Sequence, residues 1–561
     1  MVWVDRTVGE IKERFAEKIA KGQTLVIRDE KTLSGRVHVG SLRGIVIHGL
    51  VAQVLQEQGI PSVFRFELND FDPMDEVPAS LPKELREKYL AHMGEPLYKV
   101  PDYSPLTLTL SRPSAMSSPF EAPRLSGPSG GPNGGEREER NYPMLWGKEL
   151  QEVVAPLHLP IEWYTLRPHY ERGEFNDVIR EALDHAGEIR AIYKEVSGSV
   201  KPDDWYPLQV VCEKCGKIGT TQVTGWDGKE VNYTCKPNLV KWAQGCGHSG
   251  TISPFNGNAK LPWKVEWPAK WKVFGMDIEG CGKDHSAAGG SRDIGRRIVK
   301  EIFHYQEPFN IPYEFFNLAG KKMSASKSIG ASAKEVSDML PPELLKLLML
   351  RKLPNHPIDF DPDGDTLPLL FDEYDRLADH CFKRHTNPDP DYARTFRLAQ
   401  IDFPRQPADA WHMRFSVLSF VLQMPHLHVE EEAEKLKGSA LTEEEKTALR
   451  TRAQYVEKWL QEHAPEEYRF RIVAQPPPLA LDDSQRSAIA QVIAALERCP
   501  WDGASIHEAI HTVKAEAGID PKKLFQPLYQ AFLGRDNGPQ VGWFLSTFAR
   551  EVVVRRLRHI A

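Results

Sequence analysis

The chain has 561 residues and a net charge of -7, and this length allows two or three domains with large buried cores. Its charged and hydrophobic fractions, 27% and 41%, are ordinary for a soluble globular protein. The negative charge does not indicate a nucleic-acid binder, but it does not exclude one, because a local basic face is sufficient.

The cellular location is predicted from what the sequence lacks. The first 21 residues mix charged residues with a helical apolar pattern and contain no signal peptide, and no long apolar stretch follows. We therefore expect a cytoplasmic protein that does not bind membranes. Four of the seven cysteines lie between residues 212 and 246, which favours a metal site in a reducing compartment over a disulfide framework.

An early stretch of the chain has the pattern of a strand, a helix and a second strand. Apolar runs at Thr24–Arg28 and Ser62–Phe66 predict buried strands, and apolar residues recur at helical spacing from a start near His38. This order within about forty-five residues is typical of a βαβ unit with parallel strands. Ligands bind beyond the carboxyl ends of such strands, where Gly35, His38 and Gly40 are expected.

These three residues suit a phosphate. A helix N-terminus offers partial positive charge and free N–H groups, and glycines allow a ligand to approach the backbone. His38 can donate a hydrogen bond to a phosphoryl oxygen in a transition state. A lone histidine before an apolar helix is more often a cap or a packing residue, so this local pattern alone does not decide whether His38 binds a phosphate.

An acidic segment, Glu67–Pro78, follows the second predicted strand. Its carboxylates can face a ligand or cap a turn, and we expect Asp70 and Asp72 to form a wall of the active site. Residues 104–141 are dominated by Ser, Pro and Gly and cannot bury enough apolar surface to offset their ordering entropy, which predicts a flexible insertion. Residues 144–196 are mostly helical in pattern.

A cysteine-rich segment has the spacing of a zinc knuckle. Cys212-Glu-Lys-Cys215 is followed by Cys235, Cys246 and His248, which gives five candidates for the four places of a tetrahedral zinc site. We predict that the four cysteines bind the metal, with His248 as the reserve ligand. Because protein side chains would fill every position, the zinc would be structural.

The tryptophan-rich segment that follows contains further candidates for ligand binding. Trp271–Met276 is predicted to be a buried strand, with Asp284 and His285 in the loop after it. A carboxylate in such a loop can bind ribose hydroxyls or an ammonium group. Trp263 can cover an aliphatic amine and attract its charged end by a cation–π interaction, although tryptophans more often simply pack the core.

Residues 320–330 combine lysines and serines between two glycines. Such a cationic loop can close on a polyphosphate, although a solvated surface loop is the alternative. Residues 331–561 have helical patterns, with capping boxes at Ser332 and Thr442 and no second catalytic constellation. The stretch Arg550–His559 contains four arginines and is either a nucleic-acid contact or a solvated helix face.

Two of these stretches together resemble the HIGH and KMSKS motifs of class I aminoacyl-tRNA synthetases. The first is His38-Val39-Gly40-Ser41, and the second is Lys322-Met323-Ser324-Ala325-Ser326-Lys327-Ser328. The run Trp-Lys-Val-Glu-Trp-Pro, followed by Gly-Lys-Asp-His and Gly-Gly-Ser, lies between the zinc knuckle and the second motif. This combination resembles the class I lysyl-tRNA synthetases over most of residues 20–375, and more weakly to the C-terminus.

The resemblance implies an α/β fold with two domains. A Rossmann-like, parallel-sheet catalytic domain would span residues 1–330, with an insertion at about 80–260 that carries the zinc knuckle of residues 212–248. An all-helical, cage-like anticodon-binding domain would span residues 331–561. The implied activity is ATP-dependent attachment of L-lysine to tRNA(Lys) through lysyl-adenylate, with ATP, Mg²⁺ and structural Zn²⁺. We expect a monomer in which tRNA must be bound before lysine is activated.

The resemblance also assigns residues to the two substrates. ATP would be bound by Gly35, His38, Gly40, Ser41, Asp284, Lys322, Met323, Ser324, Ser326 and Lys327, of which His38, Lys322 and Lys327 would be catalytic. Lysine would be bound by Thr32, Trp263, His285 and Tyr313, to which we add Asp70. The chain departs from the family at Glu30, where glycine is frequent, and at Ser41, where the HIGH motif ends in histidine.

Three alternatives remain open. A class I synthetase for another amino acid, especially glutamate, would need an arginine in its pocket, and none is proposed here. A non-catalytic RNA-binding paralogue would not need both phosphate motifs, which are intact. A small-molecule nucleotidyltransferase would not need the long helical C-terminal part.

Overall fold

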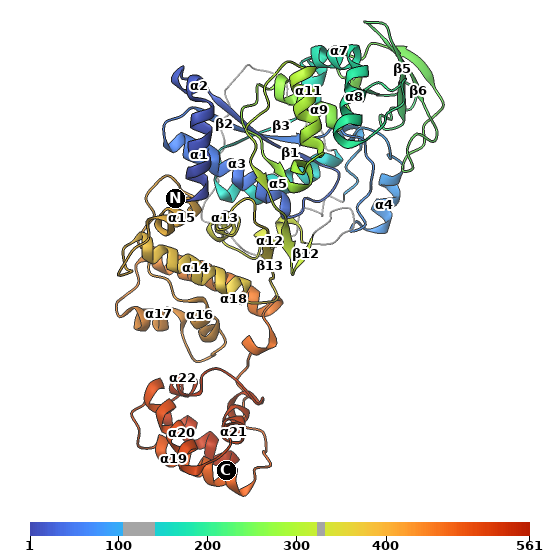
Figure 1. Ribbon diagram of the computed structural model, residues 1–561. Helices are drawn as coiled ribbons and strands as arrows, with labels where there is room; N and C mark the ends of the chain where they lie inside the picture. Colours follow the sequence, from blue (N-terminus) through green and yellow to red (C-terminus); the bar gives the residue numbers. More distant parts are fainter. Residues whose placement is uncertain (105–140, 323–330) are drawn as a thin grey trace, which may run out of the picture. The chain divides into compact units, whose positions relative to one another are not determined.

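The computed structural model describes residues 1–104, 141–322 and 331–561, which form two compact units (Figure 1). Unit 1 comprises Met1–Phe360 and Asp379–Pro407, and unit 2 comprises Asp361–Ala378 and Ala408–Ala561. These units divide the chain elsewhere than at the expected residue 330. The catalytic and anticodon-binding roles of the two expected domains stay predictions, and the insertion predicted to be flexible lies outside the described residues except at its ends.

A parallel sheet forms the centre of unit 1. Its strands are β1 (Leu25–Thr32), β2 (Ser62–Asn69) and β3 (Ile161–Thr165), in the order β1-β2-β3. Strands β1 and β2 pair in parallel over their full length, and helix α3 (Gly40–Glu57) connects them and packs on both. The predicted βαβ unit is therefore confirmed. Single parallel bridges from Ile27 to Ile278 and from Ile278 to Phe309 extend the sheet beyond β1.

Helix α3 is buried on every side. All residues from Leu42 to Leu55 are buried, because the sheet covers one side of the helix while α1 (Trp3–Arg14) and α13 (Pro342–Leu350) cover others. Its glycines permit this packing: a Cβ at Gly49 would lie 2.8 Å from a methyl carbon of Leu159. A helix of this kind fixes its N-terminus firmly against the carboxyl end of β1.

The predicted strand at Trp271–Met276 is wrong, because its first half belongs to helix α9 (Trp263–Val273) and its second half is a turn. Trp263, Trp267 and Trp271 recur every four residues, which places them on one helical face. The extended chain comes directly afterwards, at Ile278. Strand β3 also lies in a region predicted to be mostly helical.

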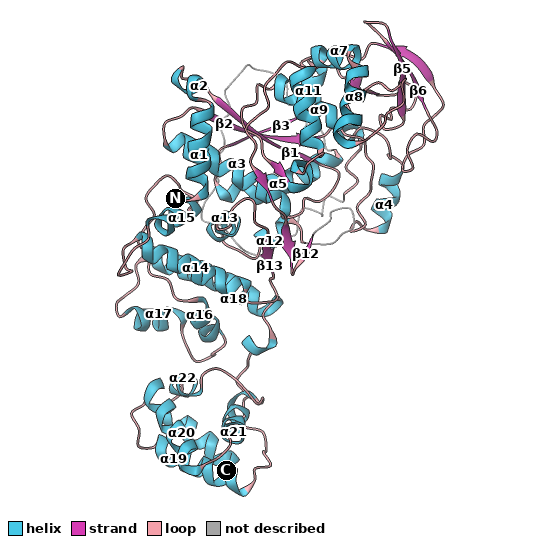
Figure 2. Cartoon of the chain, in the orientation of Figure 1, coloured by secondary structure: helices cyan, strands magenta, loops and turns pink. Residues whose placement is uncertain are grey.

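The remaining elements of unit 1 surround this core (Figure 2). The helices are α2 (Ala16–Ala20), α4 (Lys83–Leu90), α5 (Tyr142–Val154), α6 (Arg167–Glu171), α7 (Asn176–Asp184), α8 (Ala186–Ser197), α10 (Lys283–Ser286), α11 (Ser291–Glu301), α12 (Ala333–Ser337) and α15 (Pro390–Ala399), with short 3-10 turns η1 (Leu97–Lys99) and η2 (Ala155–Leu157). The short strands are β4 (Gln209–Val210), β8 (Ala259–Lys260), β9 (Cys281–Gly282), β10 (Pro312–Tyr313), β11 (Phe316–Leu318), β12 (Lys321–Lys322) and β13 (Ile358–Phe360). A separate antiparallel sheet contains β5 (Thr221–Trp226), β6 (Val231–Cys235) and β7 (Ser249–Ile252).

Unit 2, all of whose residues the structure describes, contains helices and no strand. Its elements are most of α14 (Thr366–Cys381), α16 (Phe415–Leu422), α17 (Val429–Lys437), α18 (Glu443–Glu462), the turn η3 (Glu466–Tyr468), α19 (Asp483–Leu496), α20 (Gly503–Ala517), α21 (Pro521–Leu533), α22 (Val541–Ser546) and α23 (Arg550–Ile560). The capping boxes predicted at Ser332 and Thr442 are confirmed. In the described part of the chain, none of the helices is both long and apolar enough to cross a lipid bilayer.

Candidate active site

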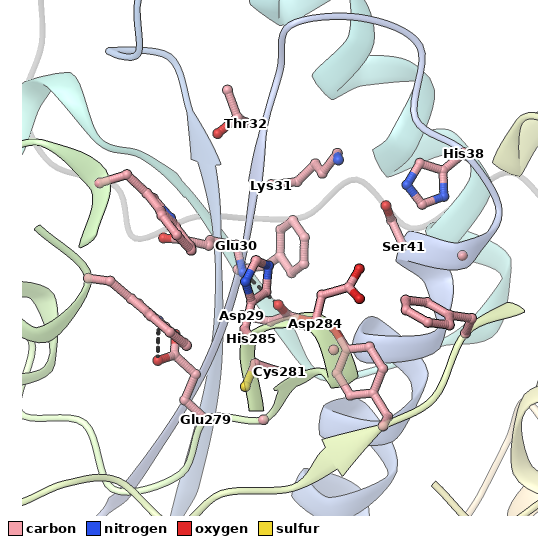
Figure 3. Close-up of a pocket in the computed structure, with 18 of the residues that line it drawn as sticks. Asp29, Glu30, Lys31, Thr32, His38, Ser41, Glu279, Cys281, Asp284 and His285 are labelled. Atoms are coloured by element: carbon pink, nitrogen blue, oxygen red, sulfur yellow. Dashed lines mark hydrogen bonds between the residues drawn. The ribbon is translucent and has the colours of Figure 1, made fainter. Parts of the chain in front are cut away.

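A cavity of about 720 Å³ lies at the carboxyl end of β1 and the N-terminus of α3 (Figure 3). Its walls come from β1, the segment after β2, helix α9, and the chain around residues 279–285 and 313–316. Eight of the predicted site residues line it: Thr32, His38, Gly40, Ser41, Trp263, Asp284, His285 and Tyr313. The structure therefore brings together residues expected at the nucleotide and residues expected at the amino acid.

Of the residues predicted to bind ATP or lysine whose side chains the structure describes, two do not line this cavity. A Cβ at Gly35 would lie 2.8 Å from Cγ of Pro78, so this glycine permits close packing of two loops. The Asp70 carboxylate accepts a hydrogen bond from the backbone N–H of Arg167 at 3.0 Å, and burial raises its pKa to about 6. Asp72, its neighbour in the acidic segment, does line the cavity.

The first motif stretch contacts the chain that follows the second motif, at Ser332 and Ala333. His38 forms an antiparallel bridge with Ser332, and the N–H of Ala333 donates to the carbonyl of Val37 at 2.8 Å. Ser332 follows the second motif closely in the sequence. Lys322 ends β12, but its side chain, together with Met323, Ser324, Ser326 and Lys327, lies outside the described residues.

The described lining of the cavity is strongly acidic. Seven carboxylates line it, from Asp29, Glu30, Asp72, Asp75, Glu279, Asp284 and Glu314, whereas Lys31 is the only lysine or arginine among the described lining residues. Of these residues, five were not assigned to the site from the sequence: Asp29, Lys31, Asp75, Glu279 and Glu314. The signal that could have found Asp29 and Lys31 is the run Arg-Asp-Glu-Lys at the carboxyl end of a strand, because ligands bind beyond that end of a parallel sheet.

A buried network of ion pairs lies behind the cavity. Arg28 on β1 pairs with Glu30 and Glu67, and its Nη1 lies 2.7 Å from Oε1 of Glu279. Lys270 of α9 lies 2.8 Å from Glu30 and 2.6 Å from Glu67. The network therefore ties β1 to β2, to α9 and to the segment that contains Ile278.

Lys260 extends the network and leaves it with an acidic excess. Its ammonium lies 2.8 Å from Asp72 and 2.7 Å from Glu266, which also pairs with Lys270. Three cations, Arg28, Lys260 and Lys270, thus meet five carboxylates, Glu30, Glu67, Glu266, Glu279 and Asp72. A cationic ligand in the cavity would lower the electrostatic cost of this excess.

Glu30 connects the network to the cavity. Its side chain is 19% exposed, whereas that of Glu67 is fully buried, so Glu30 is the partner of Lys270 and Arg28 that a ligand can reach. Burial acts to raise its pKa, but Lys270 and Arg28 together hold that pKa well below its usual value. Glu30 is therefore a carboxylate at neutral pH.

An aromatic wall stands beside this carboxylate. The rings of Trp263 and Trp267 stack with their centroids 5.7 Å apart and an interplanar angle of 11°. The ring centroid of His285 lies 5.1 Å from that of Trp263. The indole N–H of Trp267 donates to Glu279 at 2.8 Å, which fixes this ring. An apolar stem with a charged end fits such a wall, because the rings cover the stem and attract the cation.

Four cysteines form a second candidate site, with Cys235 at the end of β6 and the other three in loops before β5 and β7. The Sγ atoms of Cys212, Cys215, Cys235 and Cys246 all lie within 4.8 Å of one another. Two of their separations, Cys212 to Cys246 and Cys215 to Cys235, are 3.7 Å. Ligand bonds of about 2.3 Å in a tetrahedron place sulfur atoms about 3.8 Å apart, so the cluster fits a metal ion.

The reserve ligand His248 is not part of this cluster. Its ring packs against Tyr233 at 6.0 Å, and its backbone carbonyl accepts a hydrogen bond from the N–H of Cys235. None of the four cysteines lines the cavity. A metal ion held by them would therefore be structural.

Comparison with known sequences decides the family. The family described as tRNA synthetases class I (K) matches residues 1–107 and 132–402. The chain belongs to this family of class I tRNA synthetases. The family predicted from the HIGH and KMSKS stretches is thus confirmed, as is the parallel-sheet synthetase fold with a helical C-terminal region.

Individual relatives of this synthetase cover nearly its whole length. It is 31% identical to a lysine–tRNA ligase from Methanosarcina barkeri, over 94% of this chain and 92% of the relative. It is 29% identical to a lysine–tRNA ligase from Thermoplasma acidophilum, over 94% of each chain, and 28% identical to one from Thermoplasma volcanium, over 100% of this chain and 99% of the relative.

The C-terminal region of the synthetase matches a second family. Residues 453–561 match the anticodon binding domain, and all of them belong to unit 2. The basic stretch Arg550–His559 forms most of α23. Arg550 and Arg556 donate hydrogen bonds to backbone carbonyls, including those of Cys499 and Val473, so at least these two arginines hold the unit together.

The buried network predicts a large difference between two lysines of the same helix. Lys270→Met should lower the free energy of unfolding by about 3–5 kcal/mol, because it leaves buried carboxylates without their cation. Lys272→Met should lower it by less than about 1 kcal/mol, because the pair of Lys272 with Glu181 is partly solvated. Urea unfolding of both variants measures this difference, and equal losses would contradict the role assigned to Lys270.

Proposed function

We propose that this synthetase attaches L-lysine to tRNA(Lys) in two steps. In the first, the lysine carboxylate attacks the α-phosphorus of ATP and releases pyrophosphate, giving lysyl-adenylate. In the second, the terminal ribose hydroxyl of the tRNA takes the lysyl group and AMP leaves. The family implies ATP, a divalent metal ion, an amino acid and tRNA; full-length relatives that are lysine–tRNA ligases support lysine as the amino acid.

The observation that supports lysine most directly is the charge of the cavity. Seven carboxylates and the stacked tryptophans suit an aliphatic amine, whose ε-ammonium would lie near Glu30. Glutamate would require a cationic partner for its side chain, and no arginine is among the described lining residues. The alternative of a glutamate enzyme is therefore less well supported.

The chain's own residues would contribute mainly by positioning and by charge. His38 would donate a hydrogen bond to the phosphates, and Lys322 and Lys327 would close on the β and γ groups. Mg²⁺ would supply charge neutralisation at the polyphosphate. Thr32, Trp263 and His285 would hold lysine, while unit 2 would bind the anticodon. The cytoplasmic location and the monomeric state stay predictions.

Cys212, Cys215, Cys235 and Cys246 would hold a structural zinc ion. Their sulfur separations suit a tetrahedron, and the N–H of Cys246 donates to Sγ of Cys235 at 3.3 Å, which favours a thiolate there. The metal would fix the loops that flank β6 and β7. It would take no part in the reaction.

The proposed specificity is tested by charging total tRNA with ATP, Mg²⁺ and labelled lysine or glutamate. We expect lysine alone to be attached. Glu30→Gln should lower kcat/KM for lysine by about tenfold to a hundredfold, because a charge-assisted contact is lost, while KM for ATP changes little. Glu162→Gln, on the exposed face of β3, is the control and should change neither constant. Attachment of glutamate by the wild-type protein would overturn the proposal.

Metal analysis of the purified protein tests the zinc site. We expect one zinc ion per chain in the wild-type protein and in Cys499→Ser, and loss of the metal with a lower melting temperature in Cys235→Ser. Cys499 lies in unit 2 and serves as the control for removal of a thiol. Full zinc content in Cys235→Ser would contradict the ligand set.

A further inference from the structure

The carboxyl half of β1 has two different sides. Successive side chains of a strand point to opposite sides of the sheet. Glu30 pairs with Lys270, and Thr32 donates to Asp72 at 2.7 Å, so these residues face α9 and the acidic segment. Asp29 lies 3.2 Å from Nδ1 of His48 and therefore faces α3.

Lys31 shares the side of Asp29. Figure 3 shows its ammonium directed toward His38, with Ser41 beside that histidine. Among the described residues, the Lys31 ammonium has neither a hydrogen bond nor an ion pair, whereas Arg28, Lys260 and Lys270 each have several. A partly buried cation without a hydrogen bond or an ion pair is costly, and an anionic ligand would supply both.

His38 alone cannot supply positive charge at this end of the cavity. Burial, together with the nearby Lys31, lowers the pKa of His38 to about 4, so its imidazole is neutral at pH 7. The same burial lowers the pKa of Lys31 from its usual value, and Asp29 acts against this shift. The remaining charged lining residues that the structure describes are carboxylates, which repel a polyphosphate.

We propose that Lys31 binds the phosphates of ATP beside His38, on the α3 side of β1, while Glu30 on the other side serves lysine. This inference rests on the proposed function, because it assigns a residue to the adenylation step. In that step an oxygen of the lysine carboxylate forms a bond to the α-phosphorus, and the bond from that phosphorus to the bridging oxygen breaks. The electron pair of the broken bond leaves with pyrophosphate. Lys31 transfers no proton and stabilises the negative charge of the reacting phosphates.

The test compares Lys31→Met, Lys31→Arg and Lys31→Gln with the wild-type protein in lysine charging under saturating tRNA. Lys31→Met should lower kcat/KM for ATP by about tenfold to a hundredfold, since an ion-pair contact is lost, and leave KM for lysine within about twofold. Lys31→Arg should restore most of the loss, because it returns the positive charge. Lys21→Met, an exposed lysine at the end of α2, is the matched control and should behave as wild type. If Lys31→Met does not fold, as judged by its melting temperature, the neutral Lys31→Gln takes its place.

The outcomes separate this inference from the proposed function. Unchanged kinetics for ATP in the neutral variant would overturn the role of Lys31 while lysine charging by the wild-type protein stands. A rise in KM for lysine instead of ATP would overturn it as well, because Lys31 would then belong to the amino-acid side. Failure of the wild-type protein to charge lysine would overturn the proposed function itself. A lower kcat/KM for ATP in Lys31→Met, together with a lower kcat/KM for lysine in Glu30→Gln, would establish that the two sides of β1 bind different substrates.

Discussion

The pairing of buried charges around Arg28 and Lys270 is the interaction on which the site depends. A charge removed from water is tolerated only where a partner and hydrogen bonds replace its hydration. Here the partners come from β1, β2, α9 and the segment after α9, which are up to about 250 residues apart in the sequence. Displacing any one of these elements would leave buried charges without their partners. The network therefore fixes the walls of the cavity more strictly than apolar packing alone would.

Much of the fold was predictable because its signals are local. The alternation from a strand to a helix and back predicted β1, α3 and β2 from apolar spacing, and Ser332 with Glu335 predicted a helix start from capping chemistry. Helix α9 was not predicted because residues Trp271 to Met276 form a short, largely apolar run, which is also typical of a buried strand. The buried charges of Glu266 and Lys270, which a buried strand would not carry, become intelligible only through partners on β1, β2 and β8.

The candidate site could be predicted in part, for a topological reason. Parallel strands bring their carboxyl ends to one edge of the sheet, so Thr32, Asp284 and Tyr313 meet there although the chain separates them widely. Asp70 and Asp72 could not be distinguished from the sequence, since either can cap a turn. The structure assigns the capping role to Asp70, which accepts the N–H of Arg167 at the start of α6, and leaves Asp72 for the cavity.

The four cysteines and the four residues at the end of β1 illustrate two kinds of spacing. For the cysteines, the metal site depends on the distances between their sulfur atoms. The CxxC pair brings two cysteines together, and the hairpin of β6 and β7 adds Cys235 and Cys246. For β1, the site depends on the direction in which each side chain points, because successive residues of a strand face opposite sides of the sheet. A strand that ends in Asp-Glu-Lys-Thr can thus present an acid to one side and a lysine to the other within two residues. Lysine and ATP carry opposite charges, and one strand end of this kind can meet both without bringing the acidic wall against the phosphates.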